Sequence, residues 1–416
     1  MKFIKYIFSK DLKVFLLIVL IGLLVRLILV PLTAHGDTWC ALYSQYYWIH
    51  FGLFKINQLP EVFQGLYLKV INAPILHSAL SILFDNTPYG NTQGLDGATQ
   101  ANLAANPLAM RVIFFYKLPY FLFDLGSLVL LLKIFKKRSN RILITVFWAF
   151  NPLILHSVYM WGRYEIFSIF FVLWSFYYAK NHKVFWSIFM FGLAIAFRMP
   201  YVLVLPLLII YLSKNWKDGL KYTILALLPL VIVNKLLSIY GPDTSTYYKS
   251  FGFFEYFMTS HIYGAYANIA VNFFAYMAII WLYVIEKKRG LNFNKLVYFS
   301  LIVFLTIFSF SYFHPQYAAW LTPFLLMAMI LNRRTIIPSI ISLILLYLLI
   351  NGGMGETTGF GLFKPSSDII SQLPKLTLLP FEASMNNMMI YNSFIATNVI
   401  IMIILYKGKD RKDNED

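Results

Sequence analysis

The stretch Leu32-Thr-Ala-His-Gly-Asp-Thr-Trp39 follows directly on an apolar run, Val14 to Val30, that is long enough to cross a bilayer. No small-residue cleavage site follows the run, so we expect it to be a retained first membrane span. The stretch places the carboxylate of Asp37, next to His35, at the point where the chain leaves the membrane. Two roles are open for Asp37. It takes a proton from an attacking hydroxyl, or it caps a helix that begins near Thr38.

The composition of the chain is that of an integral membrane protein. Of its 416 residues, 59% are hydrophobic and 13% are charged, and the mean hydropathy is +0.67. Soluble domains have about 45–50% apolar and about 25% charged residues. The apolar runs lack the alternation of outer-membrane strands, which favours an all-α polytopic membrane protein over a barrel. No soluble basic domain accompanies the net charge of +17, so nucleic acid is not expected as a partner.

Apolar runs recur along almost the whole chain and predict a single integral membrane domain over residues 1–406. About twelve membrane helices are expected, some short or re-entrant, at about 12–32, 111–132, 142–159, 165–179, 184–198, 200–212, 220–237, 268–285, 296–312, 316–331, 335–351 and 388–406. Residues 33–110 form a long first outer loop, with amphipathic helices at Tyr43–Phe54 and Ala73–Phe84 and an irregular stretch from Asp85 to Asn106. Residues 407–416 are a charged tail.

The distribution of charge sets the expected orientation of the chain. If the amino terminus is cytoplasmic, most of the 35 Lys and Arg residues lie on the cytoplasmic side of the predicted spans. This is the usual excess of positive charge on cytoplasmic loops. Acidic residues, among them Asp37, Glu61 and Glu165, then concentrate on the outer side, and the carboxyl terminus is cytoplasmic as well. The single cysteine, Cys40, excludes an internal disulfide.

Two pairs of short predicted spans are interrupted by prolines, at Asn151-Pro152 and at Met199-Pro200. Non-helical backbone at membrane depth is stable only when it is buried in protein or lines a wet cavity, so these breaks indicate a site. Each break is accompanied by an arginine, Arg163 or Arg198, whose guanidinium suits bidentate contact with phosphate. The alternatives are a surface ion pair of Arg163 with Glu165 and a membrane-interface anchor for Arg198.

Three further residues belong to the same set of candidates. Lys117 and Asp124 lie two helical turns apart in the second span, where ionised side chains are costly. Lys117 could face a lipid phosphate, whereas Asp124 is expected to hold a neighbouring helix by a hydrogen bond. His314 precedes a span at the outer face, where a helix N-terminus favours an anion; the alternative is an interfacial anchor with Tyr317 and Trp320. The sequence has no HExxH, no Cys/His metal spacing and no P-loop, so neither a metal nor a cofactor is expected.

Five stretches together resemble the GT-C superfamily of membrane glycosyltransferases. They look closest to its polyprenyl-phosphate-mannose-dependent mannosyltransferases, including the GPI mannosyltransferase I type and the mycobacterial phosphatidylinositol mannoside type. In family order the stretches are His35-Gly-Asp37, Lys117-Leu-Pro to Asp124-Leu, Asn151-Pro to Trp161-Gly-Arg-Tyr-Glu165, Gly192-Leu-Ala to Phe197-Arg-Met-Pro200, and Pro315-Gln-Tyr to Trp320-Leu-Thr-Pro323. The last quarter of the chain carries no such stretch.

The resemblance implies a GT-C-like bundle and an inverting transfer of a hexose at the outer or lumenal membrane face. The donor would be a polyprenyl-phosphate sugar, with mannose as the family's sugar, and the acceptor a glycolipid or glycan. Asp37 matches the family's base. Many members have a second acid nearby, where this chain has His35, and no metal is predicted. The leaving phosphate would be bound by Arg163, Arg198, His314 and Lys117, and the sugar or acceptor by Glu165, His35, Gln316 and Tyr317.

Two other functions fit a polytopic protein. A flippase or transporter for lipid-linked sugars would carry polar residues along a path through the bilayer, whereas the candidates here lie at one face. An O-antigen-type polymerase would have its large outer loop late in the chain rather than first. The Lys-, Asn- and Ile-rich composition, with no Asn-x-Ser/Thr acceptor, favours the plasma membrane of a prokaryote over the endoplasmic reticulum.

Overall fold

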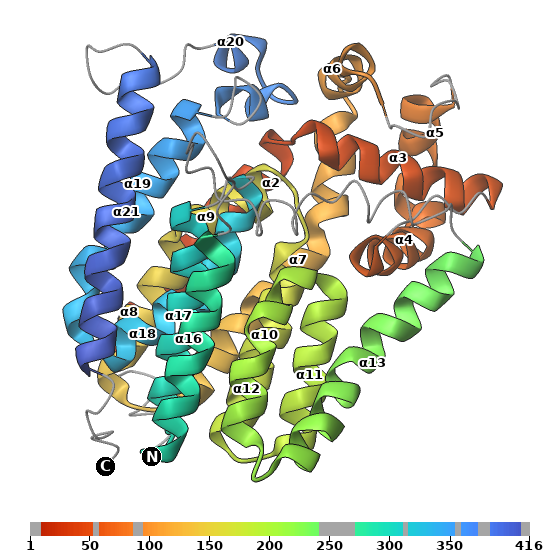
Figure 1. Cartoon of the computed structure of the whole chain (residues 1–416). Helices are drawn as coiled ribbons and strands as arrows, with labels where there is room; N and C mark the ends of the chain where they lie inside the picture. Colours follow the sequence, from red (N-terminus) through yellow and green to blue (C-terminus); the bar gives the residue numbers. More distant parts are fainter. Residues whose placement is uncertain are drawn as a thin grey trace, which may run out of the picture.

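The computed structural model of the chain describes residues 10–52, 58–85, 95–240, 271–310, 315–353, 359–372 and 383–408. Every regular element in these ranges is a helix, as the composition predicts (Figure 1). The α-helices of the first half are α2 (Lys10–Leu32), α3 (Gly36–Phe51), α4 (Leu59–Ile71), α5 (His77–Phe84), α6 (Gly97–Ala105), α7 (Ala109–Ile134), α8 (Arg138–Phe150), α9 (Pro152–Ile154), α10 (Glu165–Lys180) and α11 (Val184–Phe197).

The second half continues with α12 (Leu205–Leu212), α13 (Trp216–Tyr240), α16 (Val271–Lys288), α17 (Phe293–Phe310), α18 (Thr322–Leu331), α19 (Ile336–Gly353), α20 (Asp368–Ser371) and α21 (Ala383–Gly408). Tighter or wider turns connect several of these helices. They are the π-helical turns η1 (Asn72–Leu76) and η2 (Leu155–Met160), and the 3₁₀ turns η3 (Met199–Leu203), η4 (Pro315–Leu321), η5 (Arg333–Thr335) and η7 (Phe360–Phe363).

Seven of the described segments are long and apolar enough to cross a bilayer, which makes the chain a multi-pass membrane protein. They are Leu12–Leu32, Ala109–Ile134, Asn140–Met160, Trp216–Ile239, Phe293–Phe310, Arg333–Ile350 and Met388–Gly408. Where they are described, the predicted spans fall on helix apart from the breaks at Asn151, Arg198 and Val204, but several of these helices, such as α12 and α18, are shorter than a crossing needs. The number of crossings therefore stays a prediction.

The bundle is built around α17. Nearly every residue of this helix is buried, and it packs against α16, α18 and α21. On one side α10 packs against α7 and α11, and α11 packs against α13, while α19 and α21 pair on the other side (Figure 1). Large apolar side chains on α2, α13, α19 and α21 stay exposed, as lipid-facing helices require.

The described part of residues 33–110, which the sequence predicts to be the first outer loop, is a folded layer across one end of the bundle. Helix α3 crosses that end, and α4, α5 and α6 lie there beside it (Figure 1). Trp39 and Tyr46 of α3 are buried in a second hydrophobic core, to which α5, α6 and α7 also contribute. The helix expected at Tyr43–Phe54 thus begins earlier, at Gly36, and packing against protein positions it. The helix expected at Ala73–Phe84 is η1 followed by α5.

Helix α6 corrects the expectation of an irregular stretch from Asp85 to Asn106. Asp96 caps this helix, because its carboxylate accepts hydrogen bonds from the Thr99 N–H at 2.7 Å and from the Thr99 hydroxyl at 3.1 Å. An N-cap of this kind contributes about 1 kcal/mol, which offsets the poor helix propensity of the polar sequence. Residues 86–94 of the predicted stretch lie outside the described residues.

A buried ion pair between Arg26 and Asp124 ties α2, α7 and α8 together. Arg26 Nε donates to Asp124 Oδ2 at 2.7 Å, and its other nitrogens donate to the Trp148 and Ala149 carbonyls at 2.6 and 3.0 Å. Asp124 also accepts from Trp148 Nε1 at 2.8 Å and from the Tyr159 hydroxyl at 2.7 Å. The expectation that Asp124 holds a neighbouring helix is confirmed.

We predict that Asp124→Leu lowers the thermal unfolding temperature of the detergent-solubilised protein sharply. The substitution leaves the Arg26 guanidinium buried without its carboxylate, and breaking such a pair costs about 3–5 kcal/mol. Asp218→Asn, in the first turn of α13 and away from this network, is the control and should unfold like the parent. Equal unfolding temperatures for the two variants would contradict the prediction.

Candidate functional site

The site begins where the end of α2 meets the end of η2. The His35 N–H donates to the Trp161 carbonyl at 3.2 Å, and the Thr38 hydroxyl donates to the same oxygen at 2.6 Å. The buried ammonium of Lys117 donates to the Thr33 carbonyl at 2.5 Å and to the Tyr159 carbonyl at 2.7 Å. These contacts bring residue 37 and residue 163 to the same point of the fold.

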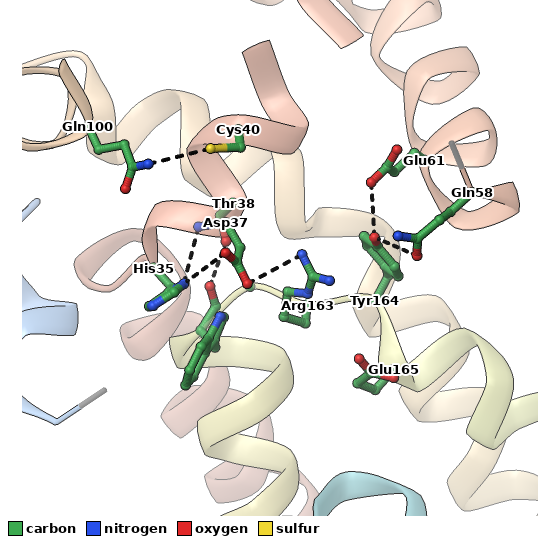
Figure 2. Close-up of polar contacts among 12 residues, drawn as sticks. His35, Asp37, Thr38, Cys40, Gln58, Glu61, Gln100, Arg163, Tyr164 and Glu165 are labelled. Atoms are coloured by element: carbon green, nitrogen blue, oxygen red, sulfur yellow. Dashed lines mark hydrogen bonds and ion pairs between the residues drawn. The ribbon is translucent and has the colours of Figure 1, made fainter. Parts of the chain in front are cut away.

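His35, rather than Asp37, caps helix α3. His35 Nδ1 accepts a hydrogen bond from the Asp37 N–H at 3.1 Å, so the capping alternative for Asp37 is wrong. The Asp37 side chain is 40% exposed, and its carboxylate oxygens lie 3.6 Å from His35 Nδ1 and 3.6 Å from an Arg163 terminal nitrogen (Figure 2). A ring nitrogen that accepts from the backbone carries no proton, so Arg163 supplies the positive charge at this carboxylate.

Arg163 reaches Asp37 because of the turn that follows η2. Gly162 has a φ of +91°, in the left-handed region that glycine adopts without strain. The Arg163 N–H donates to the Ser157 carbonyl at 3.1 Å, which closes the turn. The Arg163 guanidinium lies 4.8 Å from the centre of the Tyr164 ring, and its side chain is 11% exposed. The sequence alternative of an Arg163–Glu165 surface pair does not fit Glu165, which is fully buried.

Glu165 instead forms a bidentate ion pair with Arg198. Arg198 donates to the two carboxylate oxygens at 2.6 and 2.8 Å, and Trp320 Nε1 donates to the same carboxylate at 2.6 Å. Arg198 is 5% exposed, so it is not a snorkelling anchor. These two predicted ligand-binding residues bind each other, which favours a role in positioning the residues around them.

Gln58 and Glu61, at the start of α4, form a polar cluster with Tyr164 and Arg198 that the sequence did not indicate. The Tyr164 hydroxyl lies 3.0 Å from both Gln58 Oε1 and Glu61 Oε1 (Figure 2). Arg198 donates to Gln58 Oε1 at 3.0 Å. The centre of the Tyr164 ring also lies 4.4 Å from the Arg198 guanidinium carbon. The one signal in the sequence was an acid, Glu61, in the outer loop.

The remaining candidates are placed as follows. Lys117 is completely buried, and its contacts with carbonyls favour a structural role over phosphate binding. His314 lies outside the described residues. Gln316 and Tyr317 lie on η4, where the Tyr317 ring stacks on Trp320 with the centroids 4.3 Å apart.

No protein-family model matches the sequence, and no curated protein or solved structure matches it either. Within the described ranges, no group of three or more His, Cys, Asp and Glu side chains is placed to hold a metal ion. The fold and the site define a helical multi-pass membrane protein with a carboxylate–guanidinium pair at one end of its bundle. A second ion pair, Glu165 with Arg198, is fully buried and contacts the first through the ring of Tyr164.

We predict that Gly162→Ala is far more damaging than Gly290→Ala. Both glycines have a positive φ, +91° and +96°, so both substitutions meet a strain of about 1–2 kcal/mol. A Cβ at residue 162 would in addition lie 2.5 Å from Thr38 Oγ1 and 2.8 Å from Lys117 Cε, whereas none of the neighbouring atoms comes within 4 Å at residue 290. Thermal unfolding of the two purified variants measures the difference, and similar unfolding temperatures would show that the close approach is unimportant.

Proposed function

We propose that the chain is an inverting glycosyltransferase that uses a polyprenyl-phosphate hexose, with mannose as the expected sugar. The acceptor is a hydroxyl of a glycolipid or glycan at the outer face. The observation that carries the proposal is the pair of Asp37 and Arg163. A half-exposed carboxylate lies 3.6 Å from a guanidinium at the end of the first span, where a lipid-linked phosphate would enter from the bilayer. A base and a phosphate-binding cation are the two groups that this transfer needs.

The reaction is a single displacement at the anomeric carbon of the donor sugar. The acceptor oxygen attacks that carbon from the face opposite the phosphate, and Asp37 takes the proton of the acceptor hydroxyl. The bond between the anomeric carbon and the phosphate oxygen breaks, and its electron pair leaves with the polyprenyl phosphate. Arg163 stabilises the charge that develops on this leaving group. The sugar is transferred with inverted configuration, and the proton on Asp37 passes to water.

The buried pair of Glu165 and Arg198 supports the site from behind. It fixes Tyr164 through contacts with Arg198 and Gln58, and Tyr164 in turn lies against the Arg163 guanidinium. Catalytic cations act best when their position is set before the substrate arrives, because no reorganisation is then needed in the transition state. We therefore assign Glu165 and Arg198 as positioning residues in this proposal, and leave Lys117 out of the phosphate site.

The topology belongs to the same proposal: about twelve crossings, both termini in the cytoplasm and a prokaryotic plasma membrane. A flippase is the alternative, and it would need charged groups available along the bundle. The intramembrane charges Arg26 and Asp124 do not favour it, because both are buried and hydrogen-bonded to neighbouring helices. The candidate groups for transfer lie at one end of the bundle.

We predict that Asp37→Asn lowers sugar transfer by about 10²–10⁴-fold, because the amide cannot take the proton of the acceptor hydroxyl. The assay follows radiolabel from polyprenyl-phosphate mannose into native lipid extract, catalysed by membranes that carry each variant. Asp96→Asn is the matched control, since it changes another outer-loop acid and asparagine still caps a helix well. Full activity in the Asp37 variant would remove Asp37 as the base. No transfer by the parent protein from any polyprenyl-phosphate hexose would overturn the proposed function.

The two arginines should respond differently to replacement by glutamine. Arg163→Gln should weaken inhibition by polyprenyl phosphate about 10- to 100-fold with little loss of stability, because a charge-assisted hydrogen bond contributes about 1.5–3 kcal/mol. Arg198→Gln should instead lower the unfolding temperature markedly, because it leaves Glu165 buried without its charge partner. Inhibition constants and thermal unfolding of the same preparations separate the two roles. Unchanged inhibition in the Arg163 variant would contradict its assignment.

A further inference from the structure

The turns η2 and η4 meet directly behind the Asp37–Arg163 pair. Turn η2 is π-helical, and the Trp161 N–H closes it by donating to the His156 carbonyl at 2.7 Å. π-Helical turns are rare in proteins, and those that occur are often found at functional sites. Turn η4 packs against α9, η2 and α10. The Ser157 carbonyl accepts from the Arg163 N–H, so this interface continues into the candidate catalytic turn.

Buried polar atoms without hydrogen-bond partners collect along this interface. They are the Asn151 amide nitrogen, the Ser157 hydroxyl, the Gln316 carbonyl oxygen and the Thr322 hydroxyl. These four residues are between 0% and 8% exposed, and none of these atoms is bonded within the part of the chain that the structure describes. Leaving such atoms unpaired is costly, so a ligand that pairs them gains affinity.

The chemistry of these four groups fits a sugar rather than an ion. The amide nitrogen donates, the carbonyl oxygen accepts and the two hydroxyls do both, and none of them is charged. The hydroxyls of a hexose donate and accept in the same way. A phosphate attached to that hexose would lie toward Arg163, which follows η2 in the chain.

We propose that Ser157 and Gln316 bind hydroxyl groups of the donor hexose, in a subsite between η2 and η4. This inference rests on the proposed function, because it assigns the hexose of the polyprenyl-phosphate donor to the subsite. Ser157 is then a specificity residue that the sequence did not indicate, and the partner of Gln316 is a hydroxyl group of the hexose. Asn151 also caps α9 through its side-chain oxygen, so it is not a clean test of the subsite.

The subsite has an unusual consequence for stability. Removing the unpaired Ser157 hydroxyl does not strand a partner, so Ser157→Ala should unfold no earlier than the parent when no ligand is present. Gln316→Leu also removes the amide nitrogen that bonds to Tyr317, so only its ligand-dependent shift is used. Both should nevertheless bind the sugar-bearing lipid about tenfold more weakly, because each loses a hydrogen bond to the hexose. Ser300→Ala is the matched control, since this buried hydroxyl donates to the Leu296 carbonyl within α17, away from the site.

The experiment measures thermal unfolding of the full chain in detergent with polyprenyl-phosphate mannose and, separately, with polyprenyl phosphate. The difference between the two shifts reports the contribution of the sugar. We expect the full difference in the parent and in Ser300→Ala, and a smaller difference in Ser157→Ala and in Gln316→Leu. A difference that stays at the parent value in both variants places the hexose elsewhere and overturns the inference, as does a parent protein that shows no difference.

A transfer assay on the same preparations separates this inference from the proposed function. If the sugar-dependent shift is reduced in the two variants while the parent transfers no sugar, the subsite stands and the transferase proposal fails. If the parent transfers sugar and the two variants keep the shift, the proposed function stands and the subsite fails.

Discussion

The buried ammonium of Lys117 satisfies the backbone at two helix ends at once. The Thr33 carbonyl near the end of α2 and the Tyr159 carbonyl in η2 both accept hydrogen bonds from Lys117 Nζ, and an unsatisfied carbonyl inside a membrane protein costs several kcal/mol. By donating to Thr33 and Tyr159, the ammonium fixes the end of the first span against the turn that carries Arg163. Together with the hydrogen bonds from His35 and Thr38 to the Trp161 carbonyl, this contact brings Asp37 and Arg163 together, although Lys117 itself is far too buried to meet a substrate.

The charged groups of the bundle differ in burial, and burial decides what each can do. The pairs of Arg26 with Asp124 and of Arg198 with Glu165 have short contacts and almost no exposure, so they hold helices together. The carboxylate of Asp37 is farther from its cation and is partly open to solvent. A group in that state can exchange its partner for a ligand without leaving a buried charge behind. For this reason we propose Asp37, and neither buried carboxylate, as the catalytic base.

Helices α3 to α6 add polar side chains to the end of the bundle and so complete the candidate site. Helices α3 to α6 rest on a hydrophobic core of their own above α7, so the polar side chains of α3 and α4 stay fixed over the end of the bundle. Asp37 lies on one side of Arg163 and Tyr164. Gln58 and Glu61, at the start of α4, lie on the other side and contact Tyr164 (Figure 2). The candidate site therefore combines polar groups from α3, from the start of α4 and from the turn that follows η2.

The sequence by itself determined that the protein is a helical membrane protein and where its long apolar helices lie, but not helix α6 or the start of α3. Long apolar runs can satisfy their backbone in a bilayer only as helices, and prolines after Asn151 and Met199 mark where the helices break. The sequence also predicted that Asp124 bonds to a neighbouring helix. It could not rank the charged residues, because an arginine looks the same whether it meets a buried carboxylate or an exposed one. Only the tertiary structure decided that Glu165 pairs with Arg198 while Arg163 reaches Asp37, since these contacts join residues that packing alone brings together.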